Sequence, residues 1–435
     1  MSSLSNAFQK ASDLISPHSF VAVLSQVIQM VCGFVVLRWV TPEQVGPWQA
    51  LLLLEPYMGV LRLGIVNAMN RSYAFLLGAG QRQQALACVE TTFSYTLFIS
   101  VLEMFLLGVG LFVWASGHDV WLAGAAVFCV YAPIGLFRNY LEATYRSSRD
   151  FRALSMVQLV TALFSIVSVL LVIRWGFVGY MIRLLLLQFG GTALCWYFRP
   201  VRVAPVFHFD IFKKLMIDGF FLYLNNWLTG VSSSFFRILL LQAGGSVLLG
   251  RFSPIAAVMA MGTMIPSTIS VYLLPRLNFD FGSTKSSSKV VADSLRASLV
   301  SFGLMIPCIA AGCWVLPPLL QWIAPAYHVT PLSVRLALVI TLFASYNLSV
   351  NAFTVLGKWC YMILNLILLL SASWLGPLLG IRYLPENPLE GALVGCLIAT
   401  LVRIPVTTVL LLHSRRDLKR DKLVDMIAKE MKNYE

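Results

Sequence analysis

Long apolar runs, separated by short polar breaks, follow one another along the whole chain. An α-helix needs roughly 20 apolar residues to cross about 30 Å of hydrocarbon, and the runs have about this length. They are continuous and rich in leucine, rather than alternating over about ten residues as the strands of a transmembrane barrel do. We therefore predict an all-α polytopic membrane protein with helices at 20–38, 47–68, 89–113, 120–138, 154–173, 177–198, 215–239, 247–272, 294–316, 332–352, 359–379 and 390–412.

Composition supports this class. Of the 435 residues, 58% are hydrophobic and 12% charged, which is more apolar surface than one soluble core could bury. The eight cysteines fall within or beside the predicted helices without metal-ligand spacing, and no histidine pair has that spacing. The chain has neither a Walker loop nor a Gly-x-Ser-x-Gly motif. We therefore expect no catalytic residues, no metal and no cofactor.

Lysine and arginine in the loops are distributed unevenly. With the N-terminus in the cytoplasm, Arg38, Arg174 and Arg382 fall outside and the other loop cations fall inside, so the positive-inside rule places both termini in the cytoplasm. Eight tryptophans agree, since they lie near the outer helix ends: Trp39, Trp48, Trp114, Trp121, Trp175, Trp314, Trp322 and Trp374. Because topology accounts for much of the net charge of +13, we expect no nucleic-acid partner.

A weak internal repeat divides the chain. The segments 24–48 and 224–252 both place a polar pair after Leu, then an Arg, then a Gly-x-aromatic at the next helix start. Six helices followed by six related ones predict two bundles around a central cavity, with a substrate site between the halves. The predicted parts are a cytoplasmic N-terminal segment (1–19), a first bundle (20–198), a cytoplasmic linker (199–214), a second bundle (215–412) and a cytoplasmic amphipathic tail (413–435).

Two charges interrupt the second predicted helix, LLLLEPYMGVLRLG (51–64). A charge at the centre of a membrane helix costs roughly 2.5–3.5 kcal/mol on insertion scales, so Glu55 and Arg62 must face protein or water. Seven residues separate them, which is two helical turns or about 10 Å on one face. That distance prevents direct pairing, so either other helices supply partners or a hydrated cavity solvates both.

The seventh predicted helix favours the cavity, because Asp218, Asn225, Asn226, Thr229, Ser232, Ser233 and Arg237 recur on it at spacings typical of one helix face. Further arginines, Arg183, Arg251, Arg335 and Arg403, fall within other predicted helices. Embedded acids are fewer: Glu55, Glu103 and Asp218. The excess of arginine predicts a net positive cavity suited to an anion such as pyrophosphate, which guanidinium groups bind in a bidentate way. Glu55 and Asp218 are candidate protonation sites for ion coupling, or structural acids.

Four segments resemble one family along nearly the whole chain: LGIVNAMNRSYAFLLGAGQRQQA (63–85), VLRWVTPEQVGPWQALLL (36–53), YLEATYRSSRDFRALSMVQLV (140–160) and GRFSPIAAVMAMGTMIPSTISVYLLPRL (250–277). They are similar to Wzx-like polysaccharide repeat-unit (O-antigen) flippases of the multidrug/oligosaccharidyl-lipid/polysaccharide exporter superfamily. The resemblance implies alternating access by two six-helix bundles in a bacterial inner membrane. The implied substrate is an undecaprenyl-pyrophosphate-linked oligosaccharide, with membrane lipids, a polysaccharide polymerase and a chain-length regulator as partners.

The resemblance also carries residue roles. By motif position it adds Arg38 to the cationic site formed by Arg62, Arg183, Arg237 and Arg251, and it places Arg71 and Arg276 at a cytoplasmic gate, where both also read as topology charges. Two other functions stay open. An ion-coupled multidrug or organic-cation antiporter of the same fold would want an acidic cavity. A membrane enzyme of the same polysaccharide pathway would need a larger outer loop than 380–389.

Overall fold

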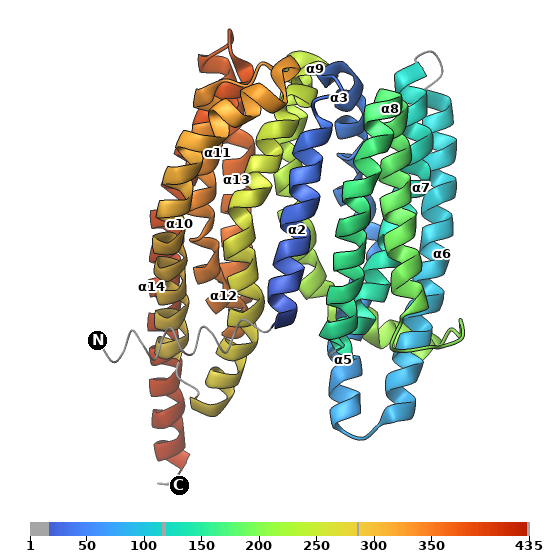
Figure 1. The fold of residues 1–435 in the computed structure, drawn as a ribbon. Coiled ribbons are helices and arrows are strands. Elements are labelled where there is room, and N and C mark those ends of the chain that lie inside the picture. Colours follow the sequence, from blue (N-terminus) through green and yellow to red (C-terminus); the bar gives the residue numbers. More distant parts are fainter. Residues whose placement is uncertain (1–16, 115–118, 149, 285–286, 433–435) are drawn as a thin grey trace. The chain divides into compact units, whose positions relative to one another are not determined.

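The computed structural model describes residues 17–114, 119–148, 150–284 and 287–432, and over these residues the chain is helical with no β-strand (Figure 1). Residues 1–16 of the predicted N-terminal segment lie outside the described residues. The side chains of the tail from residue 415 onward also lie outside them.

The helices and their bounds are α2 Pro17–Val36, α3 Pro42–Leu51, α4 Leu54–Met58, the 3₁₀ helix η1 Gly59–Arg62, α5 Ile65–Gly78, α6 Arg82–Trp114, α7 Asp119–Ser147, α8 Phe151–Tyr197, α9 Phe209–Thr284, α10 Ser287–Ile323, the 3₁₀ helix η2 Pro325–Tyr327, α11 Pro331–Ala344, α12 Asn347–Val355, α13 Trp359–Tyr383 and α14 Pro388–Lys432. Ten of the twelve predicted spans coincide with one of these helices or with part of one, whereas 47–68 runs over α3, α4, η1 and α5 and 332–352 over α11 and α12. The prediction of an all-α polytopic membrane protein is confirmed.

Two helices, α8 and α9, have apolar parts long enough to cross the membrane twice. The apolar parts of α8 and α9 are 47 and 44 residues long, which at 1.5 Å per residue is about twice the hydrocarbon thickness. Each turns back at a glycine with a left-handed backbone, Gly176 in α8 (φ 55°) and Gly245 in α9 (φ 68°). Each therefore holds two spans, and with α2 and the bent pair α3 to α5 the described residues contain the twelve predicted spans.

The second predicted span differs from its prediction. A continuous helix over 47–68 is wrong, because the segment is divided into α3, α4, η1 and α5 and bends by 56° between Pro42–Arg62 and Ile65–Leu77. The bend lies at Leu63 and Gly64, which both have left-handed backbones (φ 46° and 74°). Apolarity alone predicted a membrane span here but could not show that the helix breaks inside it.

The described chain forms two compact units, Met1–Ser253 with Ile323–Tyr327, and Pro254–Trp322 with His328–Glu435. The boundary differs from the predicted linker at 199–214, since the first half of α9 belongs to the first unit. The short η2 segment joins that unit because the Tyr327 hydroxyl donates to the Val40 carbonyl at 2.9 Å. Burial raises the pKa of Tyr327 well above its usual range.

In the first unit α6, α7 and α8 lie side by side, and α2 packs along α8 (Figure 1). One core cluster surrounds Trp48 and Phe128 between α3 and α7, and another surrounds Met69 and Tyr145. In the second unit α13 and α14 approach closely through small residues, since a Cβ on Gly376 would lie 2.6 Å from the Gly395 carbonyl oxygen. Such small-residue contacts are typical of helix pairs in membranes.

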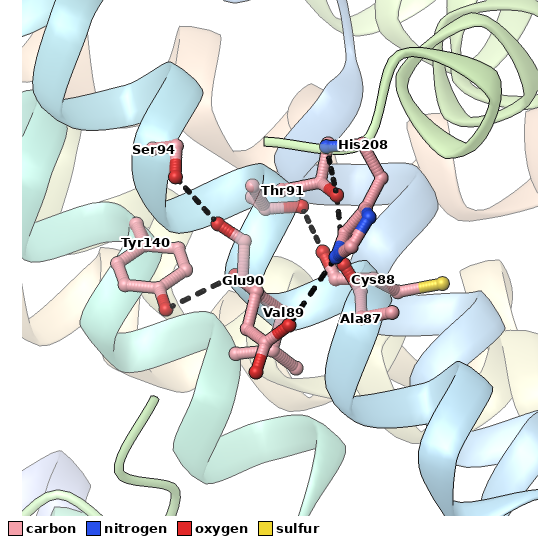
Figure 2. Close-up of polar contacts among 9 residues, drawn as sticks. Ala87, Cys88, Val89, Glu90, Thr91, Ser94, Tyr140 and His208 are labelled. Atoms are coloured by element: carbon pink, nitrogen blue, oxygen red, sulfur yellow. Dashed lines mark hydrogen bonds and ion pairs between the residues drawn. The ribbon is translucent and has the colours of Figure 1, made fainter. Parts of the chain in front are cut away.

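The segment between α8 and α9, residues 198–208, is hydrogen-bonded to α6. Figure 2 shows His208 beside Glu90 and Thr91: His208 Nε2 lies 3.4 Å from Glu90 Oε2, and the His208 amide donates to Thr91 Oγ1 at 3.4 Å. At the other end of the segment the Arg199 guanidinium stacks 3.4 Å from the centre of the Trp196 ring. Burial, with Arg202 nearby, lowers the pKa of Arg199. These contacts fix where α9 begins relative to the first six spans.

Candidate functional site

The break in the second span exposes backbone carbonyls that the neighbouring helices satisfy. Trp227 Nε1 donates to the Pro56 carbonyl at 2.8 Å, and the Tyr223 hydroxyl donates to the Gly59 carbonyl. Tyr95 on α6 donates to the Leu61 carbonyl at 2.6 Å. Within a membrane, irregular backbone is tolerated where such partners or a water-filled cavity replace the lost helical bonds. The break is therefore a supported feature of the first unit.

A close backbone approach allows α9 to reach the break. A Cβ on Gly64 would lie 2.6 Å from both the Gly219 carbonyl oxygen and Tyr223 Cβ. Gly219 is buried in turn against Gly64 and Ala68. With no side chain on either glycine, α9 packs directly on the start of α5, which brings Tyr223 and Trp227 to the carbonyls of η1 and α4.

A cavity of about 320 Å³ lies at this break, within the first unit. Its lining comes from α4, η1, α5, α7 and α9: Glu55, Pro56, Gly59, Arg62, Gly64, Val66, Asn67, Asn139, Tyr223, Trp227 and Gly230. The two charges that interrupt the second predicted span, Glu55 and Arg62, therefore line one cavity. Neither forms an ion pair with any residue of the described chain.

The charges around the cavity act on one another. Arg62 is half-buried and interacts electrostatically with the Tyr223 hydroxyl. Glu55 is exposed, and its charge reaches Arg237 on α9. Glu103 on α6 interacts electrostatically with Arg62 and with Glu55. It is 3% exposed and does not line the cavity. The charged lining of the cavity is therefore one cation and one anion, Arg62 and Glu55, and Arg237 acts on Glu55 from outside the lining.

Three arginines predicted at the same site lie elsewhere. Arg183 is 5% exposed inside the first unit, where its Nη2 donates to Ser165 Oγ at 2.7 Å. The expectation that Arg183 faces the cavity is therefore wrong. Its guanidinium is hydrogen-bonded to the neutral hydroxyl of Ser165, which lies on the other arm of the same helical hairpin, α8. Arg38 and Arg251 are exposed, the first in the turn after α2 and the second beyond the Gly245 bend, and neither lines this cavity.

Among the described side chains of the polar stripe on α9, none lines this cavity. Ser232 donates to the Thr229 carbonyl at 2.9 Å and Ser233 to the Gly230 carbonyl at 2.7 Å, so both hydroxyls are used on their own helix. Thr229 is exposed, and of this turn Gly230 contributes to the lining. The side chains of Asn225 and Asn226 lie outside the described residues.

The remaining predicted residues separate as well. Asp218 and Arg71 line a second cavity in the first unit, which is distinct from the first in its lining. The side chain of Arg276 lies outside the described residues. In the second unit Arg403 is 8% exposed and donates to Asn347 Oδ1 at 2.8 Å, and Arg335 Nε reaches the Cys313 carbonyl at 3.5 Å.

Sequence reasoning missed Tyr223, Trp227, Asn67 and Asn139. Tyr223 and Trp227 are four residues apart, and therefore on one face of α9, next to the polar stripe. Aromatic residues with a donor on an otherwise polar helix face were the available signal. Asn67 and Asn139 gave none, because a single asparagine in a membrane helix is compatible with many interhelical bonds.

Replacing Trp227 with Phe tests the support of the break. The variant keeps an aromatic ring but leaves the Pro56 carbonyl without its donor, which should cost about 1–3 kcal/mol of stability. Thermal unfolding of the purified protein in detergent measures the loss. Trp175→Phe is the control, because Trp175 is 55% exposed. Equal melting temperatures for the two variants would contradict the support.

Comparison with solved structures identifies the fold. The chain is similar to an inward-facing multidrug resistance MATE family transporter of the MOP superfamily (TM-score 0.72, 17% identity, 92% of this chain and 99% of that one). It is also similar to an outward-facing one (TM-score 0.62, 18% identity, 93% and 97%). A third structure is a MOP superfamily transporter from Pyrococcus furiosus, described by a binding pocket of reverse polarity (TM-score 0.62, 17% identity, 90% and 94%). No protein-family profile and no curated protein matches the sequence.

The chain therefore has the fold of MOP superfamily transporters over nearly its whole length.

Proposed function

We propose that this protein is a transporter working by alternating access that flips a lipid-linked (undecaprenyl-pyrophosphate) oligosaccharide across a bacterial inner membrane. The observation that carries the proposal is Arg62, a cation without an ion pair among the described residues, on the wall of a cavity inside a membrane-spanning bundle. The fold supports the transport mechanism, since solved structures of this fold include inward-facing and outward-facing conformations.

An arginine without an ion pair among the described residues favours an anionic substrate at the cavity. Arg62 lines the cavity, Arg237 acts on Glu55, the one carboxylate of the lining, and a guanidinium binds phosphate through two parallel hydrogen bonds. Around them, the amides of Asn67 and Asn139 are suited to sugar hydroxyls, and Trp227 offers an aromatic ring. A pyrophosphate held by arginine with a saccharide beside it would use each of these groups.

A second candidate is an ion-coupled antiporter of organic cations. Glu55 favours it, because an exposed carboxylate on a cavity wall can take a proton or attract a cation. The multidrug transporters among the structural neighbours favour it too. Against it, the acid shares its cavity with Arg62 and lies within the field of Arg237, which repel a cationic substrate.

Reconstitution into proteoliposomes separates the two functions. One assay follows a polyprenyl-pyrophosphate-linked saccharide with a lectin that cannot cross the membrane, and reports its transfer between leaflets. The other follows accumulation of ethidium driven by a pH or sodium gradient. We expect transfer of the saccharide lipid without ethidium accumulation. Ethidium accumulation without saccharide transfer would replace the flippase by the antiporter.

Replacing Glu55 with Gln also separates the two functions, because the two predict opposite effects on transport. We expect downhill flipping of the saccharide lipid to persist, because the change removes negative charge from a site that binds an anion. In an ion-coupled antiporter the same change would abolish gradient-driven uptake. Glu386→Gln, at an exposed position between α13 and α14, is the matched control. Loss of downhill flipping in Glu55→Gln alone would show that the carboxylate takes part in anion transport and contradict this prediction.

A further inference from the structure

A second cavity, of about 480 Å³, lies in the first unit where the end of α5, the beginning of α6 and the beginning of α9 meet. Arg71 on α5 and Lys214 on α9 line it, and both are exposed. Lys214 also acts electrostatically on Cys88 of α6, which lies on the cavity wall. Two cations from different helices thus face one space.

Neither cation is neutralised by an ion pair within the described chain, although Asp218 lines the same cavity. Gln84 adds an amide that can donate to an oxyanion. Two unpaired cations, an amide donor and one carboxylate leave the cavity with an excess of positive charge and of hydrogen-bond donors. A phosphate group satisfies this arrangement, since charge-assisted hydrogen bonds to phosphate are among the stronger ones in proteins.

The rest of the lining is apolar. It includes Leu215, which is buried, and Phe75 on α5, which is 73% exposed. Free phosphate would gain nothing from such a wall, whereas a lipid can place its phosphate between the cations and its chain along the apolar residues. The cavity also lies at the end of the spans that the lysine and arginine pattern places in the cytoplasm, where anionic lipids of that leaflet attract lysine and arginine side chains.

We propose that this cavity binds the phosphate of a membrane lipid, with Arg71 and Lys214 holding the phosphate and Phe75 and Leu215 contacting the chain. The proposal goes beyond the transport function, because binding here requires no transport. Its test is a binding measurement on the purified full chain, so its failure and the failure of the proposed flippase are distinguishable.

The measurement is equilibrium binding of fluorescent phosphatidic acid to the protein in neutral detergent, with unlabelled competitors. We expect Arg71→Gln combined with Lys214→Gln to weaken binding at least about tenfold, the effect of losing roughly 1.4 kcal/mol of charge-assisted bonding. Lys213→Gln, an exposed neighbour outside the cavity, should bind as the unmodified chain does. Asp218→Asn should bind more tightly, because it removes the one negative charge of the lining.

Three outcomes would overturn the proposal. Unchanged affinity in the double variant would exclude Arg71 and Lys214 as the phosphate ligands. An equal loss in Lys213→Gln would show general attraction to a basic surface. Competition by inorganic phosphate as strong as by phosphatidic acid would replace the lipid by a free anion, whereas phosphatidic acid competing more strongly than phosphatidylcholine of the same chains is the expected result.

Discussion

Replacing Arg62 with Ala is expected to lower the flipping rate of the lipid-linked saccharide by roughly 10- to 100-fold. The change removes charge-assisted hydrogen bonds to pyrophosphate, worth about 1.5–3 kcal/mol, and each 1.4 kcal/mol is a factor of ten. Arg62→Lys keeps the charge but not the two parallel donors, so it should restore part of the rate. In cells, the Ala variant should lose surface polysaccharide while the lipid-linked unit accumulates in the cytoplasmic leaflet.

The control for Arg62 is Arg174→Ala, which removes an exposed arginine near the Gly176 bend of α8 and should leave the rate unchanged. Membrane levels of each variant are measured first, so that loss of protein is not read as loss of transport. Arg237→Ala should give a smaller loss than Arg62→Ala, since Arg237 acts on the cavity through Glu55 and does not line it. Normal flipping in Arg62→Ala would contradict the role of the cavity in anion transport.

The membrane spans could be predicted because the length of helix needed to cross the hydrocarbon matches the length of the apolar runs in the sequence. The break at Leu63 and Gly64 could not, since its cause lies elsewhere in the sequence. Tyr223 and Trp227 donate hydrogen bonds to the carbonyls that the break leaves without helical partners. Gly219 allows α9 to approach closely enough for these hydrogen bonds to form. A sequence pattern within the second span contains none of these partners.

The site could be predicted only in part for a related reason. The cost of charge in a membrane correctly singled out Glu55 and Arg62 as residues that face a cavity. The same argument selected Arg183, whose cost is met by the Ser165 hydroxyl inside the first unit. An arginine that lines a cavity and an arginine that is hydrogen-bonded to a hydroxyl look the same in the sequence. They differ in their neighbours in space, which depend on the fold.

Replacing Gly64 with Ala is expected to destabilise the protein by about 2–5 kcal/mol, the combined cost of a left-handed backbone for alanine and of overpacking a close contact. The added Cβ would lie 2.6 Å from the Gly219 carbonyl oxygen and from Tyr223 Cβ, so α9 must move away from α5. That movement takes Tyr223 from the Gly59 carbonyl. Thermal unfolding in detergent measures the loss, and the flipping rate should fall with it.

Gly80→Ala separates the two contributions to this cost. Gly80 lies between α5 and α6 with nearly the same backbone angle as Gly64 (φ 75° against 74°), but nothing lies within 4 Å of a Cβ added there. Its variant should therefore lose only the backbone part, about 1–2 kcal/mol, and keep its flipping rate. If both alanine variants lose the same stability, the contact of α9 with the break contributes nothing. A larger loss at Gly64 alone shows that this contact holds the cavity wall carrying Arg62 in place.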